Sequence, residues 1–383
     1  MDRPPVSVEV VARTDVGLIR SNNQDTFLVG DLDAGEAIDA AEPDERTIVS
    51  RGPLLIVCDG MGGAAGGEVA SKLAADVIWA EMRVARATDE RPVYARILRR
   101  AVRLANRRVH EEGARDPSLH GMGTTVSAAG MVGDAIILAQ VGDSRAYIHR
   151  GATLTQVTRD QSIAAALVHS GRMTPREAKQ TVHANMILQA LGVKEDVDPS
   201  ISLVEVRRGD ALLLCSDGLH GPVDDDKLRA TLCACPDLDE AADTLIRLAH
   251  AAGAPDNVTA VIARFDGEGL RPPTSEEDLP RFTEIDPSEE GDRALTTTSW
   301  VARRLAAKAG LAEDPGPPPI PATGQHPVYR GDVPGPGGGE AAPDGPASVR
   351  LQRSSRPGLV AWILVAVAAL AVGALVLWRL LLR

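Results

Sequence analysis

Four aspartates could form a metal site, because each stands where an apolar segment or its flanking loop ends: Asp25 in SNNQDTF, Asp59 in LLIVCDGMGG, Asp217 in LLLCSDGLHG and Asp256 in APDNVT. A strand that Leu, Ile and Val draw into a core delivers a carboxylate at its end to the rim of a sheet. Several carboxylates that converge there repel one another unless cations neutralise them. Hard carboxylate oxygens without a set of histidines suit magnesium or manganese rather than zinc. The pattern therefore predicts a site for such ions.

The elements that must hold these aspartates lie between Val6 and about Phe265. Strand-like segments cluster together and helical stretches stand in separate blocks, which predicts antiparallel sheets with helices packed outside rather than alternating βαβ units. The predicted class is therefore α+β. The predicted strands are VSVEVVA, TFLVG, TIVSRGPLLIVCD, TTVSAAGMV, DAIILAQVG, SRAYIHR, ISLVEV, ALLLCSD and NVTAVIARF, and the predicted helices cover about 67–83, 91–112, 225–234 and 238–252, with 161–190 mostly helical.

The composition excludes several classes of protein. The 383 residues include 41 basic and 53 acidic side chains, and this net charge of −12 leaves no excess of Lys and Arg with which a general nucleic-acid binder displaces counterions. Four cysteines are too few to staple a secreted mini-domain. Residues 1–15 contain no apolar core of a signal peptide, so we expect the N-terminal bulk of the chain to stay in the cytoplasm.

A change of composition near residue 266 predicts three parts. Residues 1–266 form the globular domain. Residues 267–356 form a disordered linker, acidic at first and then rich in Pro and Gly, because such segments bury too little apolar area to offset the entropy of ordering. Within the linker, residues 299–311 have a helical pattern. This segment is either a docking helix for an anionic membrane surface or a transient helix in a tether.

Residues 357–383 are predicted to be a single transmembrane helix with a short tail. The stretch from Gly358 to Trp378 carries no charge, and a helix of that length rises about 31 Å, enough to cross a hydrocarbon core of about 30 Å. Trp362 and Trp378 stand near its ends, where amphipathic rings prefer the headgroup region. More arginines precede the span than follow it, which favours a cytoplasmic globular domain. We therefore expect a single-pass protein of the cell membrane.

Six ordered motifs, spread over nearly all of residues 8–265, resemble those of the metal-dependent type-2C protein phosphatases (the PPM family) in their bacterial form. The motifs are TDVGLIRSNNQD, VCDGMGG with the following GGEVAS, GMGTT, VGDSRAY, CSDGL and PDNVT, in the order of the family. The resemblance implies a four-layer α-β-β-α sandwich of two antiparallel sheets flanked by helices, which agrees with the α+β class. It also implies Mn²⁺ or Mg²⁺ as the cofactor, with two ions per catalytic domain and a weak third.

Carried over position by position, the resemblance implies a set of metal ligands. Asp59 would bridge the two ions, and the Gly60 carbonyl would bind the second ion. Asp217 and Asp256 would complete the shell of the first. Asp143, in VGDSR, would help to hold the third and weaker ion.

The same resemblance implies a reaction and two further residues for it. Arg20 would grip the substrate phosphate with its planar donor fork, and Asp25 would hold a coordinated water. With Asp59 they make up the implied catalytic set. The reaction would be hydrolysis of phosphoserine and phosphothreonine in proteins, in which a hydroxide that bridges two divalent ions attacks phosphorus in line.

Departures from the family pattern affect the metal site. Gln24 stands where the family has Glu, which removes one negative charge and would weaken the second ion. Gly221 stands where many bacterial members have an Asp that shares the third ion, so the third site should be poor. Asp143 and Ser144 could instead be a two-residue hairpin turn.

Two positions near the substrate also depart from the pattern. Gln161 replaces the His of an RDHS-like stretch in the flap, which we define as residues 158–192. His220, beside the metal loop, is either a general acid for the leaving group or a structural histidine. The flap and its surroundings would determine which substrate is accepted.

The expected partners are phosphorylated proteins, namely serine/threonine protein kinases and their substrates, together with the membrane that holds the C-terminal helix. Nucleic acid is not expected. The competing hypothesis is a membrane-tethered pseudophosphatase that acts as a regulatory binding module, which Gln24 and Gly221 motivate. A third interpretation keeps the metal site but changes the substrate to a small phosphoester or a phosphorylated anti-sigma antagonist.

Overall fold

The computed structural model describes residues 6–39, 47–49, 52–62, 66–85, 90–174, 177–178, 186–274, 279–287 and 293–295. The chain divides into two compact units, residues 1–318 and 319–383, and the described residues all belong to the first. The predicted helix at 299–311 and the predicted transmembrane segment lie outside them. Among the helices that are described, none has the length and apolar character needed to cross a membrane.

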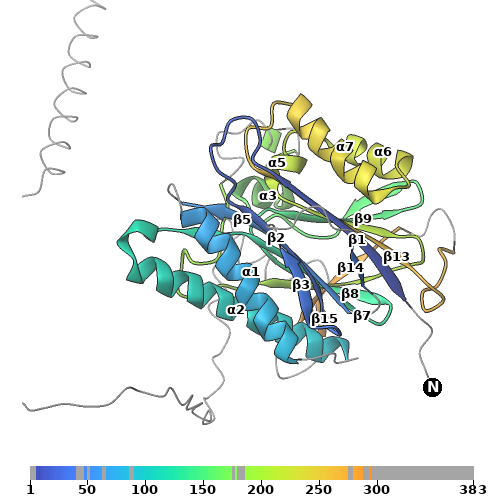
Figure 1. Cartoon of the computed structure of the whole chain (residues 1–383), viewed down its shortest axis with the longest axis horizontal. Coiled ribbons are helices and arrows are strands. Elements are labelled where there is room, and N and C mark those ends of the chain that lie inside the picture. Colours follow the sequence, from blue (N-terminus) through green and yellow to red (C-terminus); the bar gives the residue numbers. More distant parts are fainter. Residues whose placement is uncertain are drawn as a thin grey trace, which may run out of the picture. The chain divides into compact units, whose positions relative to one another are not determined.

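The described strands form two antiparallel sheets (Figure 1). The first sheet has the order β10 (Thr153–Gln156), β9 (Arg145–Arg150), β12 (Ala211–Cys215), β13 (Val258–Asp266), β1 (Ser7–Asp15) and β4 (Thr47–Val49). The second has the order β15 (Arg293–Leu295), β14 (Phe282–Asp286), β11 (Ser200–Glu205), β8 (Ala135–Val141), β7 (Val126–Val132), β5 (Pro53–Met61), β2 (Asp25–Asp31) and β3 (Glu36–Asp39), with β6 (Gly123–Thr124) paired to β5.

Helices cover the outer face of each sheet, as Figure 1 shows. The helices α1 (Gly66–Ala85) and α2 (Arg91–Arg115) pack on the second sheet, and α6 (Asp225–Ala234) and α7 (Leu238–Ala251) pack on the first. An aspartate caps the N-terminus of both α6 and α7. Asp224 accepts a hydrogen bond from Lys227 N, and Asp237 accepts hydrogen bonds from Asp239 N and Glu240 N. The remaining short described helices are α3 (Ile163–His169), the 3-10 turn Pro117–Leu119 and α5 (Asp217–His220).

Alternation along the central strands separates three buried clusters and so produces the layers. On β5, Leu54, Ile56 and Cys58 face the helices α1 and α2, whereas Leu55 and Val57 lie between the sheets. On β12, Leu212 and Leu214 lie between the sheets, and Leu213 and Cys215 face α6 and α7. Because successive side chains of a strand point to opposite faces, both strands are buried on both sides. The predicted sandwich of two antiparallel sheets flanked by helices is confirmed.

The structure differs from the sequence-based strands at two places where the chain changes sheet. TIVSRGPLLIVCD is predicted as one apolar run but contains two strands, β4 in the first sheet and β5 in the second. The hairpin turn predicted as the alternative for Asp143 and Ser144 is wrong, because β8 and β9 belong to different sheets and do not pair. Residues 142–144 are a crossing between the sheets, with Gly142 at φ 97°.

Ordered structure continues past residue 266. Leu270 is buried against the core between the sheets, and β14 pairs with β11 in the register Ser202↔Glu284 and Val204↔Phe282. The segment 161–190, predicted as mostly helical, contains α3 and non-helical turns among its described residues. The start of the predicted linker thus contributes two strands, β14 and β15, to the second sheet.

Candidate active site

The four aspartates of the sequence pattern come from both sheets. Asp25 begins β2 and is the register partner of Asp59 on β5. Asp217 is the first residue of α5, directly after β12, and Asp256 precedes β13, the neighbour of β12. Their charges reach one another, because Asp25, Asp217 and Asp256 all raise the pKa of Asp59. The structure therefore gathers the residues that the sequence predicted to meet.

Asp25 is buried and held by two hydroxyl groups. Ser216 Oγ and Thr259 Oγ1 each donate a hydrogen bond of 2.7 Å to Asp25 Oδ2. Burial raises the pKa of Asp25 to about 7, with help from the charge of Asp217, although the two hydroxyl hydrogen bonds oppose the shift. The carboxylate is thus fixed in position but costly to ionise without a nearby cation.

Asp59 is positioned through its backbone. Its N–H donates to Thr125 Oγ1 at 2.9 Å, and its carbonyl accepts from Thr125 N at 2.9 Å. The same Thr125 hydroxyl lies 2.8 Å from Ser144 Oγ, next to Asp143. Burial first, and then the neighbouring carboxylates, raise the pKa of Asp59 well above its ordinary value.

Asp217 offers an oxygen that nothing among the described residues satisfies. Its Oδ1 is inaccessible to solvent and has no hydrogen-bond partner there. Burial and the charge of Asp256 raise the pKa of Asp217, and a hydrogen bond with Asp59 opposes this. An orphaned carboxylate oxygen beside three further carboxylates fits a hard divalent cation, which supplies the missing positive charge.

The carboxylates do not, however, form a ready metal shell. No three His, Cys, Asp or Glu side chains of the described part of the chain converge closely enough to hold an ion between them. Asp256 Oδ2 is paired with Arg20 Nη2 at 2.7 Å, and its Oδ1 accepts from Asn257 N at 2.9 Å. The predicted roles of Arg20 on phosphate and Asp256 on metal therefore both require this ion pair to open.

The loop that carries Arg20 is anchored by one buried side chain. Asn257 Nδ2 donates to the carbonyls of Val16 and Asn22, each at 2.9 Å, and its Oδ1 accepts from Gln24 N at 2.8 Å. These bonds span more than 230 residues of sequence. Asn257 thus holds the loop between Val16 and Gln24, and Arg20 of that loop lies half exposed beside Asp256.

The backbone beside Asp59 is packed too tightly for any side chain at Gly60. A Cβ there would lie 2.2 Å from Gly67 O and 2.5 Å from Gln24 O. The Gly60 N–H donates to Gln24 O at 3.1 Å, so Gln24 is held against the metal loop by its backbone at both its N–H and its carbonyl. The effect of Gln24 on ion binding stays a prediction.

Asp143 is buried at the crossing between the sheets and lies near the other carboxylates. Burial raises its pKa to about 7, and the charge of Asp217 adds to the effect. At Gly221 a Cβ would lie 2.7 Å from Asp217 O, so a side chain there would require the backbone to shift. Tight packing at position 221 is consistent with the lack of a ligand side chain there. Weak binding of a third ion stays a prediction.

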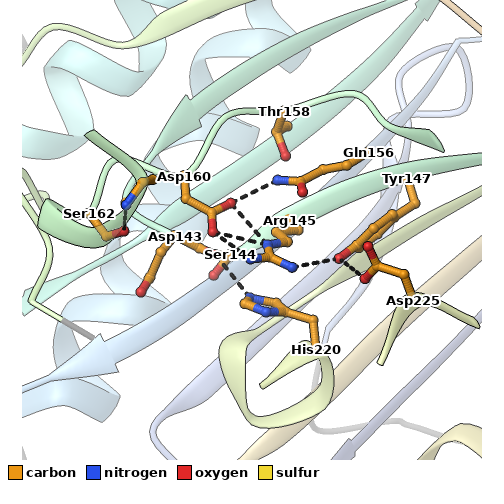
Figure 2. A network of polar contacts seen from close by, with 12 residues as sticks. Asp143, Ser144, Arg145, Tyr147, Gln156, Thr158, Asp160, Ser162, His220 and Asp225 are labelled. Atoms are coloured by element: carbon orange, nitrogen blue, oxygen red, sulfur yellow. Dashed lines mark hydrogen bonds and ion pairs between the residues drawn. The ribbon is translucent and has the colours of Figure 1, made fainter. Parts of the chain in front are cut away.

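Figure 2 shows the network beneath Asp143, centred on Arg145. Arg145 forms a forked pair with Asp160, with Nε at 2.9 Å from Oδ1 and Nη2 at 2.7 Å from Oδ2, and its Nη1 donates to Tyr147 Oη at 2.9 Å. Tyr147 in turn donates to Asp225 at 3.1 Å. Asp160 belongs to the flap, so Arg145 joins the start of the flap to the first sheet.

His220 makes a structural contact with the crossing between the sheets. Its Nε2 lies 3.0 Å from the Asp143 carbonyl, as Figure 2 shows, and the side chain is buried. Burial and the charge of Arg145 lower its pKa to about 3, so the ring is neutral and donates to that carbonyl. Gln161 is likewise buried: its Oε1 accepts from Gly142 N at 3.1 Å, and its Nε2 donates to Gln140 O at 3.2 Å.

The sequence interpretation missed the residues that hold Asp25 and Asp59. Ser216, Thr259 and Thr125 lie inside the motifs CSDGL, PDNVT and GMGTT, so their hydroxyl groups at motif positions were the available signal. The two cysteines beside the predicted metal loops, Cys58 and Cys215, are buried core residues.

The matches to known proteins agree with this geometry. The sequence model described as "Protein phosphatase 2C" matches residues 39–260, more than half of the chain. The chain belongs to the protein phosphatase 2C family. The match ends before β14 begins.

Similar proteins include bacterial serine/threonine phosphatases. The serine/threonine protein phosphatase PstP of Mycobacterium tuberculosis is 38% identical over 266 residues, which cover 69% of this chain and 46% of PstP. The protein phosphatase PhpP of Streptococcus pneumoniae is 32% identical over 264 residues, which cover 68% of this chain and 99% of PhpP. The chain thus spans about half the length of PstP and nearly all of PhpP.

A solved structure gives the same fold. The crystal structure of the PstP catalytic domain in complex with two manganese ions superposes with a TM-score of 0.57 at 36% identity, covering 68% of this chain and 99% of that domain. The two-sheet architecture is therefore shared with a protein that binds two metal ions.

Proposed function

We propose that this chain is a metal-dependent protein phosphatase that hydrolyses phosphoserine and phosphothreonine in proteins. The observation that carries the proposal is the gathering of Asp25, Asp59, Asp217 and Asp256 from both sheets, with the Oδ1 of Asp217 buried and unsatisfied among the described residues. Membership of the protein phosphatase 2C family and the names of the bacterial relatives support it.

Two manganese or magnesium ions would be held by Asp59, Asp217, Asp256 and the Gly60 carbonyl. When bound, such a pair of ions neutralises charge on the phosphoryl group and activates a water molecule as a nucleophile. Arg20 would turn from Asp256 to the substrate phosphate, which its planar fork suits. Asp25, fixed by Ser216 and Thr259, would orient a water molecule through hydrogen bonds.

The experiment is phosphate release from a phosphothreonine peptide by the full chain, with manganese, with magnesium and with EDTA. We expect release in both metals, none in EDTA, and recovery when manganese is restored. A folded chain that binds manganese yet releases no phosphate would contradict the proposal and favour the pseudophosphatase hypothesis. The proposal is preferred to that hypothesis because Arg20 and all four site aspartates are present in the chain.

We also propose that residues 357–383 anchor the chain in the cell membrane, with the catalytic domain on the cytoplasmic side. The uncharged stretch, its terminal tryptophans and the arginines before it support this. A tether raises the local concentration of the phosphatase against membrane-bound kinases and their substrates.

Deleting residues 357–383 should move the chain from the membrane to the soluble fraction, leave turnover of a soluble phosphopeptide unchanged, and slow dephosphorylation of a membrane kinase. If the shortened chain dephosphorylated both substrates at the same rates as the full chain, the proposed role of the anchor would be contradicted.

A further inference from the structure

The strand β14 is an ordered part of the domain although it lies beyond the family match. It extends the second sheet at β11, and its alternate residues face two cores: Phe282 packs against the cluster between the sheets and Ile285 packs against the cluster under α2. These partly buried apolar contacts on both faces stabilise the strand in addition to its three register pairs.

One acidic residue of β14 is buried. Glu284 is 7% exposed, its Oε1 lies 3.4 Å from Arg159 Nη1, and its Oε2 has no partner among the described residues. The Arg159 guanidinium also lies over the Phe282 ring at 5.6 Å. A buried carboxylate is expensive unless an opposite charge accompanies it, so Glu284 holds Arg159 in place and is itself held by it.

Arg159 stands at the start of the flap. The next residue, Asp160, forms the forked pair with Arg145 shown in Figure 2, and Arg145 is two residues from Asp143. The contact between β14 and Arg159 therefore reaches the flap at the point where it leaves the first sheet.

A second line of contacts joins β14 to the other end of the flap. Asp286 Oδ1 lies 3.1 Å from Arg99 Nη1 on α2, and Arg99 Nη2 lies 3.0 Å from Asp198 Oδ1. Gln189 Nε2 donates to the Asp198 carbonyl at 2.8 Å and to Gln161 Oε1 at 2.9 Å. That Gln161 oxygen also accepts from Gly142 N, one residue before Asp143.

We propose that β14 is a positioning element that fastens both ends of the flap, with Glu284 and Asp286 as its contact residues. The segment that follows the family domain would thereby set how the flap meets a phosphoprotein substrate. This inference rests on the proposed function for its catalytic consequence. The positioning itself is a property of the fold and can be tested without turnover.

The test compares Glu284→Gln with a matched substitution, Glu205→Gln, in the full chain. Glu205 lies on the neighbouring strand β11, is half exposed and pairs with Arg207. Two substrates are used: a phosphothreonine peptide, which must meet the flap, and p-nitrophenyl phosphate, which needs the metal site alone. Hydrogen exchange is measured at Gln161 and Leu188, whose N–H groups bond to Gly142 O and Gln161 O.

We expect Glu284→Gln to raise KM for the peptide about three- to tenfold and to speed exchange at both amides, while p-nitrophenyl phosphate hydrolysis changes less than twofold. Arg159→Gln should raise the peptide KM as much as Glu284→Gln does. The double variant should raise this KM no further than either single variant, because the two residues act through one contact. Glu205→Gln should change none of these quantities.

Equal losses on both substrates, an unchanged peptide KM, or additive effects in the double variant would overturn the inference. If the parent chain hydrolyses neither substrate, the proposed function fails, and exchange alone decides: unchanged exchange in Glu284→Gln would overturn the positioning role. Should Glu284→Gln fail to fold, Asp286→Asn replaces it, because Asp286 is 46% exposed. Faster hydrogen exchange at the Leu188 amide of Asp286→Asn would then support the positioning role, and unchanged exchange would overturn it.

Discussion

Replacing Asp59 with Asn is expected to lower metal-dependent phosphate release about a thousandfold or more. The charges of the other three carboxylates all act on Asp59. It is the residue implied to contact both ions, so its loss removes a shared ligand of the whole centre. The side chains have the same shape, and the backbone hydrogen bonds to Thr125 do not involve the carboxylate. The fold should therefore survive the substitution.

The measurement is initial rates of phosphate release with the phosphothreonine peptide across a manganese titration. The control is Asp226→Asn on α6, whose side chain is 91% exposed and which should retain full activity. Because Asp59→Asn removes a buried carboxyl group that is costly to ionise beside other carboxylates, the metal-free variant should also unfold at a higher temperature than the parent at pH 8. Activity above a tenth of the parent's at any manganese concentration would contradict the role of Asp59.

The metal-free protein is expected to lose stability as pH rises from about 5 to 8, and manganese should cancel this loss. The folded-state pKa values of Asp25 and Asp143 are raised to about 7 and that of Asp59 is raised well above its ordinary value, all principally by burial. A group with a raised folded pKa binds its proton more tightly in the folded state. Its stabilising contribution is therefore complete below the unfolded pKa and is lost as pH rises through the folded pKa.

Each such group costs roughly 1 kcal/mol per pH unit until it ionises at its folded pKa, so the unfolding midpoint in EDTA should fall by at least about 5 °C between pH 5 and pH 8. Bound manganese compensates the ionised carboxylates, so its stabilising effect should be larger at pH 8 than at pH 6. Differential scanning fluorimetry at these pH values, with EDTA or manganese, measures both quantities. A metal-free midpoint that does not change with pH would contradict the electrostatic account of the site.

The start of the linker shows how far composition can predict order. Residues 276–292 are acidic, and this composition predicts disorder. The structure nevertheless places Phe282 and Ile285 against existing cores and pairs β14 with β11. A short strand is stabilised by the surface that receives it, and that surface is absent from the strand's own sequence. A catalytic fragment that ends at 266 would consequently lack the contacts of Arg159.

By itself, the sequence predicted most of the strands, the main helices and the candidate site carboxylates, because alternation, helical periodicity and motif order are local properties that burial enforces along each element. The tertiary structure decided which groups face one another: the Arg20–Asp256 pair, the grip of Ser216 and Thr259 on Asp25, and the hold of Glu284 on Arg159. These contacts join residues up to 236 positions apart. The stacking of the two sheets and the points where the chain crosses between them decide which residues become partners. A local sequence pattern does not specify contacts between residues so far apart in the chain.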